Sequence, residues 1–266
     1  MITTLVKWGL WQRRISIIIW SIAVAAFISM YLAFYPSFKN QSAQLQESFK
    51  QIPEAAVALF SDTGEFFSPE GYLSSQVFYF MLPLLLGILA ISLGSSLLAK
   101  EERDGTIELL LSRPVSRANL LVAKATIGLV CIAVVGSVGL LTTVGLSNLV
   151  DIEVPLGYIA EATLVAILLS VSFCAVAFAL SATGRLGRGM AVSVSSLVAI
   201  AGYVVGSLVG MADWLKYPAK LFPFYYYRPA EILTGTYNWN NLWYMFGLIV
   251  VSALVAHFSF RQRDIR

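Results

Sequence analysis

Six long apolar stretches divide the chain, and shorter polar or charged segments separate them. Each stretch is close to or longer than the roughly 20 apolar residues that an α-helix needs to cross a bilayer. The predicted spans are residues 15–35, 77–99, 120–147, 159–183, 189–212 and 242–260. Helices are expected because lipid-exposed backbone must form its hydrogen bonds within its own segment. The pattern therefore predicts an all-α, polytopic membrane protein in which residues 1–266 form one transmembrane domain.

The segments between the spans have patterns of their own. Residues 1–14 contain basic residues and two tryptophans, which indicates an interfacial helix on the membrane surface or a simple basic anchor for the first span. Residues 36–76 have apolar positions at helical spacing, so we expect one or two short helices in this outer loop. Residues 213–241 are rich in proline and aromatic residues, which favours an outer loop or a segment that partly re-enters the membrane.

The basic residues predict the orientation of the chain. Thirteen of the 18 Lys and Arg residues lie at the termini or in the second-to-third and fourth-to-fifth connections. Cytoplasmic loops of membrane proteins are enriched in Lys and Arg. We therefore expect both termini in the cytoplasm.

Composition agrees with this reading and excludes several functions. The chain is 58% hydrophobic and 12% charged, whereas soluble domains contain about 25% charged residues, so membrane lipid must cover much of its surface. A net charge of +3 is too small to indicate a nucleic-acid partner. The two cysteines lie in apolar stretches and there is one histidine, so no metal site is expected.

The motifs of self-sufficient enzymes and transporters are absent. The sequence has no G-x-x-x-x-G-K-[ST] phosphate loop and no G-x-S-x-G elbow, so we expect no catalytic residue and no cofactor bound by this chain. Buried charges usually mark an ion pathway. The predicted spans contain almost none, and Glu161 at the outer edge of the fourth span is the nearest candidate. The energy source is therefore expected on another chain.

The connection between the second and third spans, residues 100–117, predicts a short ordered helix. Asp104 is suited to cap it, Ile107, Leu110 and Leu111 form one apolar edge, and Pro114 ends it. A solvated loop would not need an apolar edge. We expect this coupling helix to press against a cytoplasmic protein.

The same connection carries a family resemblance. EERDGTIELLLSRPVSR, residues 101–117, resembles the E-E-x-x-G-T-L-E-x-L-L-x-x-P-x-x-R signature of type-2 ATP-binding-cassette (ABC) exporter permeases, with Ile107 in place of the usual Leu. The matching residues are Glu101, Glu102, Gly105, Thr106, Glu108, Leu110, Pro114 and Arg117. FPFYYYRPAEILTG before the last span and FRQRDIR at the carboxyl end resemble further segments of that family.

The resemblance implies the permease subunit of a bacterial or archaeal plasma-membrane exporter. Two permease chains would surround a substrate pathway, and each would contact a soluble ATPase subunit that binds ATP and Mg²⁺. The amino-terminal helix and the coupling helix would contact that ATPase. The implied coupling residues are Glu101, Glu102, Arg103, Gly105, Thr106, Glu108, Arg113, Pro114 and Arg117. The second and fifth spans would line the pathway, which points to Phe80, Leu84 and Tyr203.

The fifth span has a stripe of small residues. Gly202, Gly206 and Gly210 are spaced by four, so they lie on one side of a helix and allow another segment to approach closely. Packing within the chain and contact with a second copy are both open interpretations.

Three other functions compete with the exporter permease. A stand-alone secondary transporter or channel would need its own coupling residues, and only Glu161 offers one. An intramembrane enzyme lacks a recognisable nucleophile, base or metal set. A non-transporting sensor or assembly subunit would share the ATPase contact, and a transport assay would distinguish it. The apolar spans favour an amphiphilic, lipidic, peptide or drug-like cargo over a bare ion.

Overall fold

The computed structural model describes residues 2–49, 51–61, 66–98, 116–184 and 188–262, and within these ranges it is helical, with no strand. Six helices are long and apolar enough to cross a membrane, as predicted. They are α1 (Ile2–Asn40), the π-helical segment η1 (Ser74–Met81) with α5 (Leu82–Ser96), α8 (Arg117–Ser147), α9 (Leu156–Ala182), α10 (Arg188–Ser207) and α13 (Leu242–Arg261). Five of the predicted spans lie close to the observed helices, because each follows one continuous apolar run, whereas α1 extends beyond residues 15–35 at both ends.

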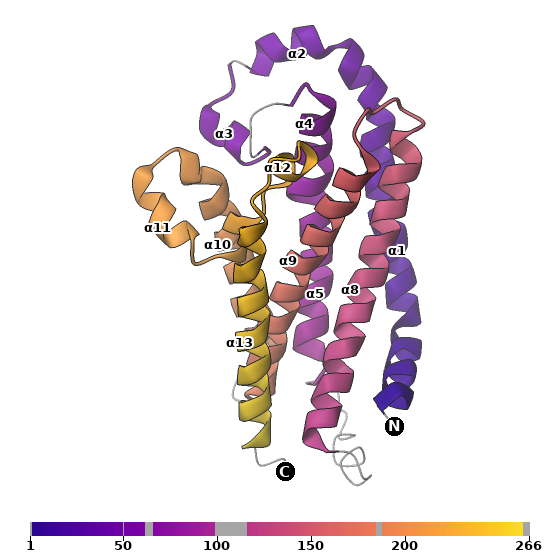
Figure 1. Ribbon diagram of the computed structural model, residues 1–266, viewed down its shortest axis with the longest axis vertical. Coiled ribbons are helices and arrows are strands. Elements are labelled where there is room, and N and C mark those ends of the chain that lie inside the picture. The colour runs from indigo at the N-terminus through magenta and orange to yellow at the C-terminus, as the bar shows by residue number, and fades with distance from the viewer. Residues whose placement is uncertain (1, 50, 62–65, 99–115, 185–187, 263–266) are drawn as a thin grey trace.

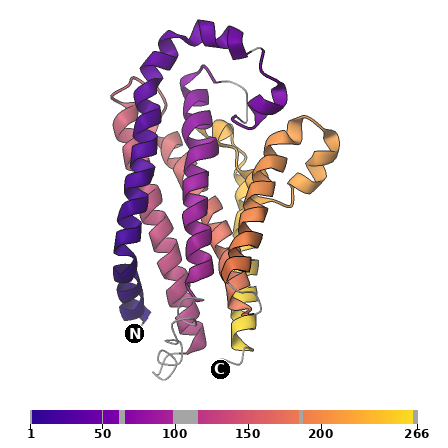
Figure 2. The same cartoon turned by 180° about the vertical axis from the view of Figure 1, so that it is seen from behind.

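The six helices stand roughly parallel, and both termini lie at the same end of the molecule, which we call the basal end (Figure 1). The opposite end is the apical end. Helix α9 is central, since it packs against α5, α8, α10 and α13. Helix α1 packs mainly on α8, and α10 packs on α5 and α9 at the other side of the bundle (Figure 2).

Residues 2–14 do not form a separate surface helix. They are the first turns of α1, which runs without a break for 39 residues, or about 58 Å at 1.5 Å per residue. Gly9 explains why this part follows the bundle. It is buried, and a Cβ placed on it would lie 2.3 Å from Cδ1 of Ile127 on α8, so α1 already contacts α8 here. The sequence-based expectation of an independent interfacial helix is therefore replaced by one long helix.

The described charged residues are unevenly distributed between the two ends. The acidic residues that the structure describes all belong to the apical half: Glu47, Glu54, Glu70, Asp151, Glu153, Glu161, Asp213 and Glu231. The described basic residues of the basal half are Lys7, Arg13, Arg14, Arg117, Lys124, Arg188 and Arg261. Among the described residues, acidic side chains thus lie in the apical half, whereas basic side chains occur in both halves.

Short helices cover the apical end. In the 36–76 segment they are α2 (Ser42–Phe49), α3 (Glu54–Ala58) and α4 (Pro69–Leu73), three short helices where one or two were expected. The segment after α10 contains η2 (Leu208–Gly210), η3 (Asp213–Leu215), α11 (Lys216–Ala219), η4 (Pro223–Tyr226), α12 (Pro229–Leu233) and η5 (Trp239–Asn241). Its prolines begin or interrupt these helices, and η4 folds back onto α10, α9 and α13.

Candidate functional site

Most of the predicted coupling residues lie outside the described part of the chain. These are Glu101, Glu102, Arg103, Gly105, Thr106, Glu108, Arg113 and Pro114. Arg117 is described, and it is the first residue of α8. Its Nη1 donates hydrogen bonds to the carbonyl oxygens of Phe260, at 3.3 Å, and Arg261, at 3.2 Å. The last carbonyls of a helix lack donors within the helix, so Arg117 ties the start of α8 to the end of α13.

Side chains also hold the end of α5, which precedes the coupling segment, residues 100–117. Helix α5 ends at Ser96, whose Oγ accepts a hydrogen bond from Nη2 of Arg13 on α1 at 3.3 Å. Ser181 of α9 donates through Oγ to the carbonyl of Ser95 at 3.4 Å. The helices that enter and leave the segment 99–115 are therefore joined to α1, α9 and α13.

Arg13 and Ser96 belong to no motif that the sequence displays, and Arg13 and Arg14 enter the sequence-based prediction only as basic residues that orient the chain. The structure separates these neighbours, because Arg13 reaches α5 whereas Arg14 is exposed and lies over Trp11, 3.8 Å from the ring centre. The position of Arg13 just before the first apolar span is the one feature of the sequence that could have indicated this contact.

The predicted pathway residues Phe80, Leu84 and Tyr203 lie on one face of the second and fifth spanning helices. The rings of Phe80 and Tyr203 are 5.7 Å apart between centroids, although 123 positions separate them in the chain. Leu84 lies one helical turn deeper than Phe80 and is 41% exposed. The structure therefore brings Phe80 and Tyr203 into contact and leaves Leu84 on the open surface below them.

An aromatic cluster surrounds this pair. The Tyr203 ring lies 5.9 Å from Tyr79 and 5.1 Å from Phe224, which comes from η4. Phe60, which follows α3, lies 6.3 Å from Phe80. Such spacings are within the range of favourable aromatic pairs. Elements from the second span, the fifth span and both apical segments thus meet at one point, and sequence analysis missed Tyr79, Phe224 and Phe60.

Hydrogen bonds from hydroxyl groups stabilise the aromatic cluster. Tyr79 donates to Oγ of Ser207 at 2.7 Å, and Ser207 donates to the carbonyl of Tyr203 at 2.7 Å. The Tyr203 hydroxyl donates to the carbonyl of Leu59, at the end of α3. These hydrogen bonds therefore join the end of α3, one of the short apical helices, to α10 and η1.

The π-helical segment η1 leaves one backbone carbonyl without a donor from its own helix. The Leu82 N–H donates to the carbonyl of Val77, five residues back, and Pro83 has no N–H to offer. The carbonyl of Phe78 therefore lacks its donor from position 83. The Tyr227 hydroxyl supplies that hydrogen bond at 2.8 Å. π-Helical turns are frequent at functional sites, and this one ends beside Phe80.

The glycine stripe packs within the chain at two of its three positions. A Cβ on Gly202 would lie 2.9 Å from Cβ of Phe222, and one on Gly206 would lie 3.3 Å from Cδ1 of Phe224. Gly210 faces open space. Intrachain packing therefore accounts for Gly202 and Gly206, and these two glycines serve the folded-back apical segment.

An apolar face that no described part of the chain covers lies below the cluster. On α10 it includes Leu197, Ile200 and Val204, which are 68%, 62% and 38% exposed. On α5 it includes Leu84 and Ile88. The two helices are in contact, and Figure 2 shows them side by side on one face of the bundle.

The described residues contain no group of three or more His, Cys, Asp or Glu side chains that could hold a metal ion. Cys131 and Cys174 are both buried and unpaired with each other. The chemistry that the site offers is therefore apolar and aromatic contact, with hydroxyl groups that bond to backbone.

Comparisons with known proteins agree with the resemblance noted in the sequence. A search among curated proteins gives no match. The family model described as "ABC-2 family transporter protein" matches residues 4–265, which include all six spanning helices, the coupling segment and the folded-back apical segment. The chain is thus a transmembrane permease that belongs to the ABC-2 transporter family.

Proposed function

We propose that this permease forms the substrate pathway of an ABC exporter and is driven by a separate ATP-hydrolysing subunit. The ATPase would contact the coupling segment at the basal end, in the cytoplasm, and would bind ATP and Mg²⁺. One observation carries the proposal. The side chains that flank residues 99–115 are hydrogen-bonded to other spanning helices. Ser96 bonds to Arg13 on α1, and Arg117 bonds to the end of α13.

These bonds supply a route for motion. A displacement of the coupling segment moves the end of α5 and the start of α8 directly. The Arg13 contact passes that displacement to α1, and the Arg117 contact passes it to α13. Helix α5 continues into η1, so the same displacement reaches Phe80 and the aromatic cluster. A helix transmits such displacement along its axis because its backbone hydrogen bonds keep it stiff.

The described spanning helices offer little charge for ion coupling. Glu161, the one sequence candidate, lies in the second turn of α9 at the apical end and is half-buried. A membrane-embedded ion relay normally needs several ionisable groups along the pathway. This favours an external energy source over a stand-alone secondary transporter.

A second copy of the chain would complete the pathway. The apolar face formed by α5 and α10 below the aromatic cluster is exposed among the residues that the structure describes. Two such faces across a twofold axis would enclose an apolar passage with Phe80 and Tyr203 at its apical end. Such a passage suits an amphiphilic cargo.

Affinity capture from the native membrane tests the proposal. The tagged chain should retain a soluble protein that contains a phosphate loop, and the pair should hydrolyse ATP faster than that protein alone. Reversing both signature charges, Glu101→Lys with Glu102→Lys, should abolish this stimulation or the retention. The control reverses Glu47 and Glu54, which are exposed at the apical end, and should leave both unchanged. Stimulation that survives the Glu101/Glu102 reversal would contradict the proposed coupling.

A further inference from the structure

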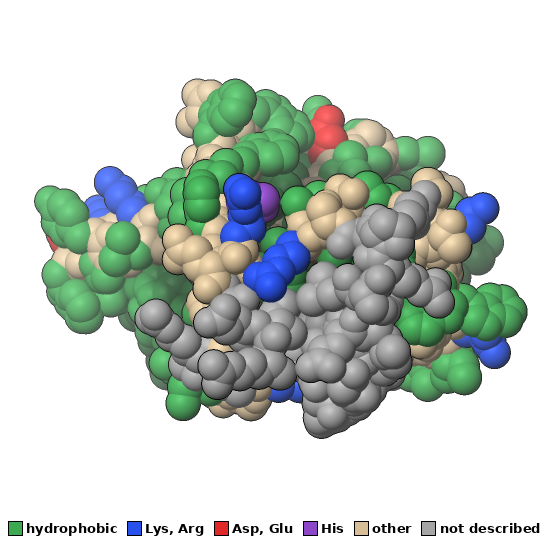
Figure 3. Space-filling model, turned by 90° about the horizontal axis from the view of Figure 1, so that it is seen from below, with side chains coloured by type: hydrophobic (Ala, Val, Ile, Leu, Met, Phe, Trp, Pro, Cys, Tyr) green, Lys and Arg blue, Asp and Glu red, His purple; other side chains and the backbone are tan. Residues whose placement is uncertain are grey.

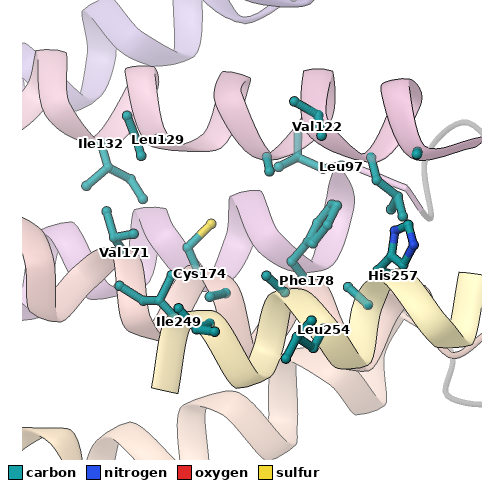
Figure 4. Close-up of a pocket in the computed structure, with 17 residues that line it drawn as sticks. Leu97, Val122, Leu129, Ile132, Val171, Cys174, Phe178, Ile249, Leu254 and His257 are labelled. Carbon is teal, nitrogen blue, oxygen red and sulfur yellow. The ribbon is translucent and has the colours of Figure 1, made fainter. Parts of the chain in front are cut away.

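A groove outside the proposed pathway runs along the other side of the bundle. It has a volume of about 420 Å³ and lies between α8, α9 and α13. This is within the range of about 300–1,000 Å³ found for ligand sites. Figure 4 shows Ile132 and Val171 at one end of the groove and His257 at the other. Apart from the His257 ring, the lining side chains are apolar or, at Cys174, a thiol.

Small residues create this groove. Ala118 and Ala125 of α8, Ala175 of α9, and Ala253 and Ala256 of α13 are all among its lining residues. Their side chains leave space between α8 and α13, which diverge above the Arg117 contact, while α13 packs more extensively against α9. The groove is therefore open between α8 and α13, at the membrane-facing surface.

The basal end of the groove is positively charged. On α13, Val250, Ala253, Leu254 and His257 line the groove at helical spacing, and Arg261 follows His257 by one further turn on the same side. Arg261 is exposed. Figure 3, which views the basal face, shows blue Lys and Arg side chains next to the purple histidine.

Arg117 adds a second guanidinium at this mouth. It bonds to the carbonyls of Phe260 and Arg261, and the next residue, Ala118, lines the groove. In the sequence, the two termini and the connections at this end carry 13 Lys and Arg residues and five Asp and Glu residues, so the balance of charge is positive. An apolar slot with a cationic mouth at one end matches an amphiphile with an apolar tail and an anionic head.

We propose that the groove binds an anionic phospholipid from the leaflet at the basal end. One acyl chain lies along Leu129, Val171 and Ile249, and the phosphate group lies beside His257 and Arg261. Apolar burial holds the chain, and basic side chains near the membrane surface attract anionic lipids. This proposal does not depend on the export function, because the groove is on the opposite side of α9 from the α5–α10 face.

Native mass spectrometry of the purified chain in detergent tests this site. The probes are phosphatidylglycerol and phosphatidylcholine with identical acyl chains. One phosphatidylglycerol should stay bound at concentrations where phosphatidylcholine does not. Ala125→Phe or Ala253→Phe fills the groove and should weaken that binding at least tenfold. Ala26→Phe, at an exposed position on α1, is the matched control and should not.

The head group is tested by removing one charge. Arg261→Gln should weaken phosphatidylglycerol binding about fivefold, as expected for one basic side chain near an anionic head group. Arg14→Gln removes an exposed charge at the same end of the molecule and should leave the affinity unchanged. Equal binding of the two lipids would overturn the proposal. Unchanged phosphatidylglycerol binding in both Ala125→Phe and Ala253→Phe would also overturn it.

A second measurement uses the unaltered protein and so does not depend on how variants fold. Phosphatidylglycerol with a photoreactive group in its acyl chain is cross-linked to the protein in vesicles, and the modified peptides are mapped. Adducts concentrated on the groove residues of α8 and α13 support the site. Adducts spread evenly over α1 and the other lipid-facing helices contradict it.

Discussion

At the scale of residues, Pro83 and Tyr227 form a complementary pair far apart in the sequence. Pro83 removes a backbone donor inside a spanning helix, and Tyr227 supplies a hydroxyl to the carbonyl of Phe78. An unsatisfied carbonyl is costly where water is absent. The pair therefore explains how an irregular helix is tolerated next to Phe80.

Tyr227→Phe should lower the free energy of unfolding by about 1 kcal/mol, because the Phe78 carbonyl loses its donor. In a Pro83→Ala background the new N–H can bond to the same helix, so Tyr227→Phe should cost less. The check is a double-mutant cycle measured by chemical unfolding in detergent micelles. Equal costs of Tyr227→Phe in the two backgrounds would contradict the pairing.

Gly94 allows a close approach between α5 and α9. A Cβ here would lie 2.3 Å from the carbonyl oxygen of Cys174, a backbone atom that cannot move aside alone. Gly94→Ala should therefore destabilise the protein by about 1–3 kcal/mol. Gly87→Ala, on the same helix with no atom within 4 Å, should be neutral or stabilising by up to about 1 kcal/mol. Similar melting temperatures for the two variants would show that α5 and α9 are less closely packed.

The candidate site was only partly predictable at this scale. Family resemblance led to Phe80 and Tyr203, which the structure places in contact. Their neighbours Tyr79 and Phe224 could not be identified, because which side of a helix faces inward depends on the π-helical segment and on how the apical segment folds back. The coupling residues before Ser116 lie outside the described residues, so their role stays a prediction.

At the scale of elements, the spanning helices were predictable and their junctions were not. Hydropathy alone locates all six. Residues 2–40 could form a surface helix followed by a span, or one long helix. Both arrangements have the same apolar pattern, and they differ only in the direction of the chain near residue 14. In α1, packing of Gly9 against Ile127 decides this direction. Tertiary contact therefore overrides the preference of a basic, tryptophan-containing segment for the membrane surface.

The attachment of α1 to α5 gives a prediction about coupling. Arg13→Gln should weaken the contact with Ser96 and lower permease-stimulated ATP hydrolysis several-fold, since α1 would no longer follow α5. The neighbouring change Arg14→Gln affects an exposed side chain on the same helix and should have little effect. Steady-state ATPase assays of the reconstituted complex compare them. Equal loss in both variants would point to general surface charge instead.

At the scale of the whole molecule, the two ends differ in charge and in cover. Both termini and the basal cations lie at one end, while the acidic residues and short helices described here lie at the other. This arrangement agrees with the orientation inferred from Lys and Arg. It predicts that the basal end faces the cytoplasm.

Cysteine labelling in intact cells checks this orientation. The native Cys131 and Cys174 are buried, so they should give little background. A membrane-impermeant maleimide should label Tyr217→Cys, since Tyr217 is 80% exposed at the apical end. It should label Gln262→Cys at the basal end only after the cells are opened. The reverse pattern would invert the orientation.

The central claim is that an external ATPase moves the spanning helices. The most direct test places a spin label at Leu84→Cys, on the open face of α5, and measures the distance between the two copies in the reconstituted complex. Two copies should be present, and the distance between them should change between the nucleotide-free and Mg²⁺–ATP states. The Glu101→Lys/Glu102→Lys variant should lose this change. An unchanged distance in the functional wild-type complex would show that the ATPase does not move these helices.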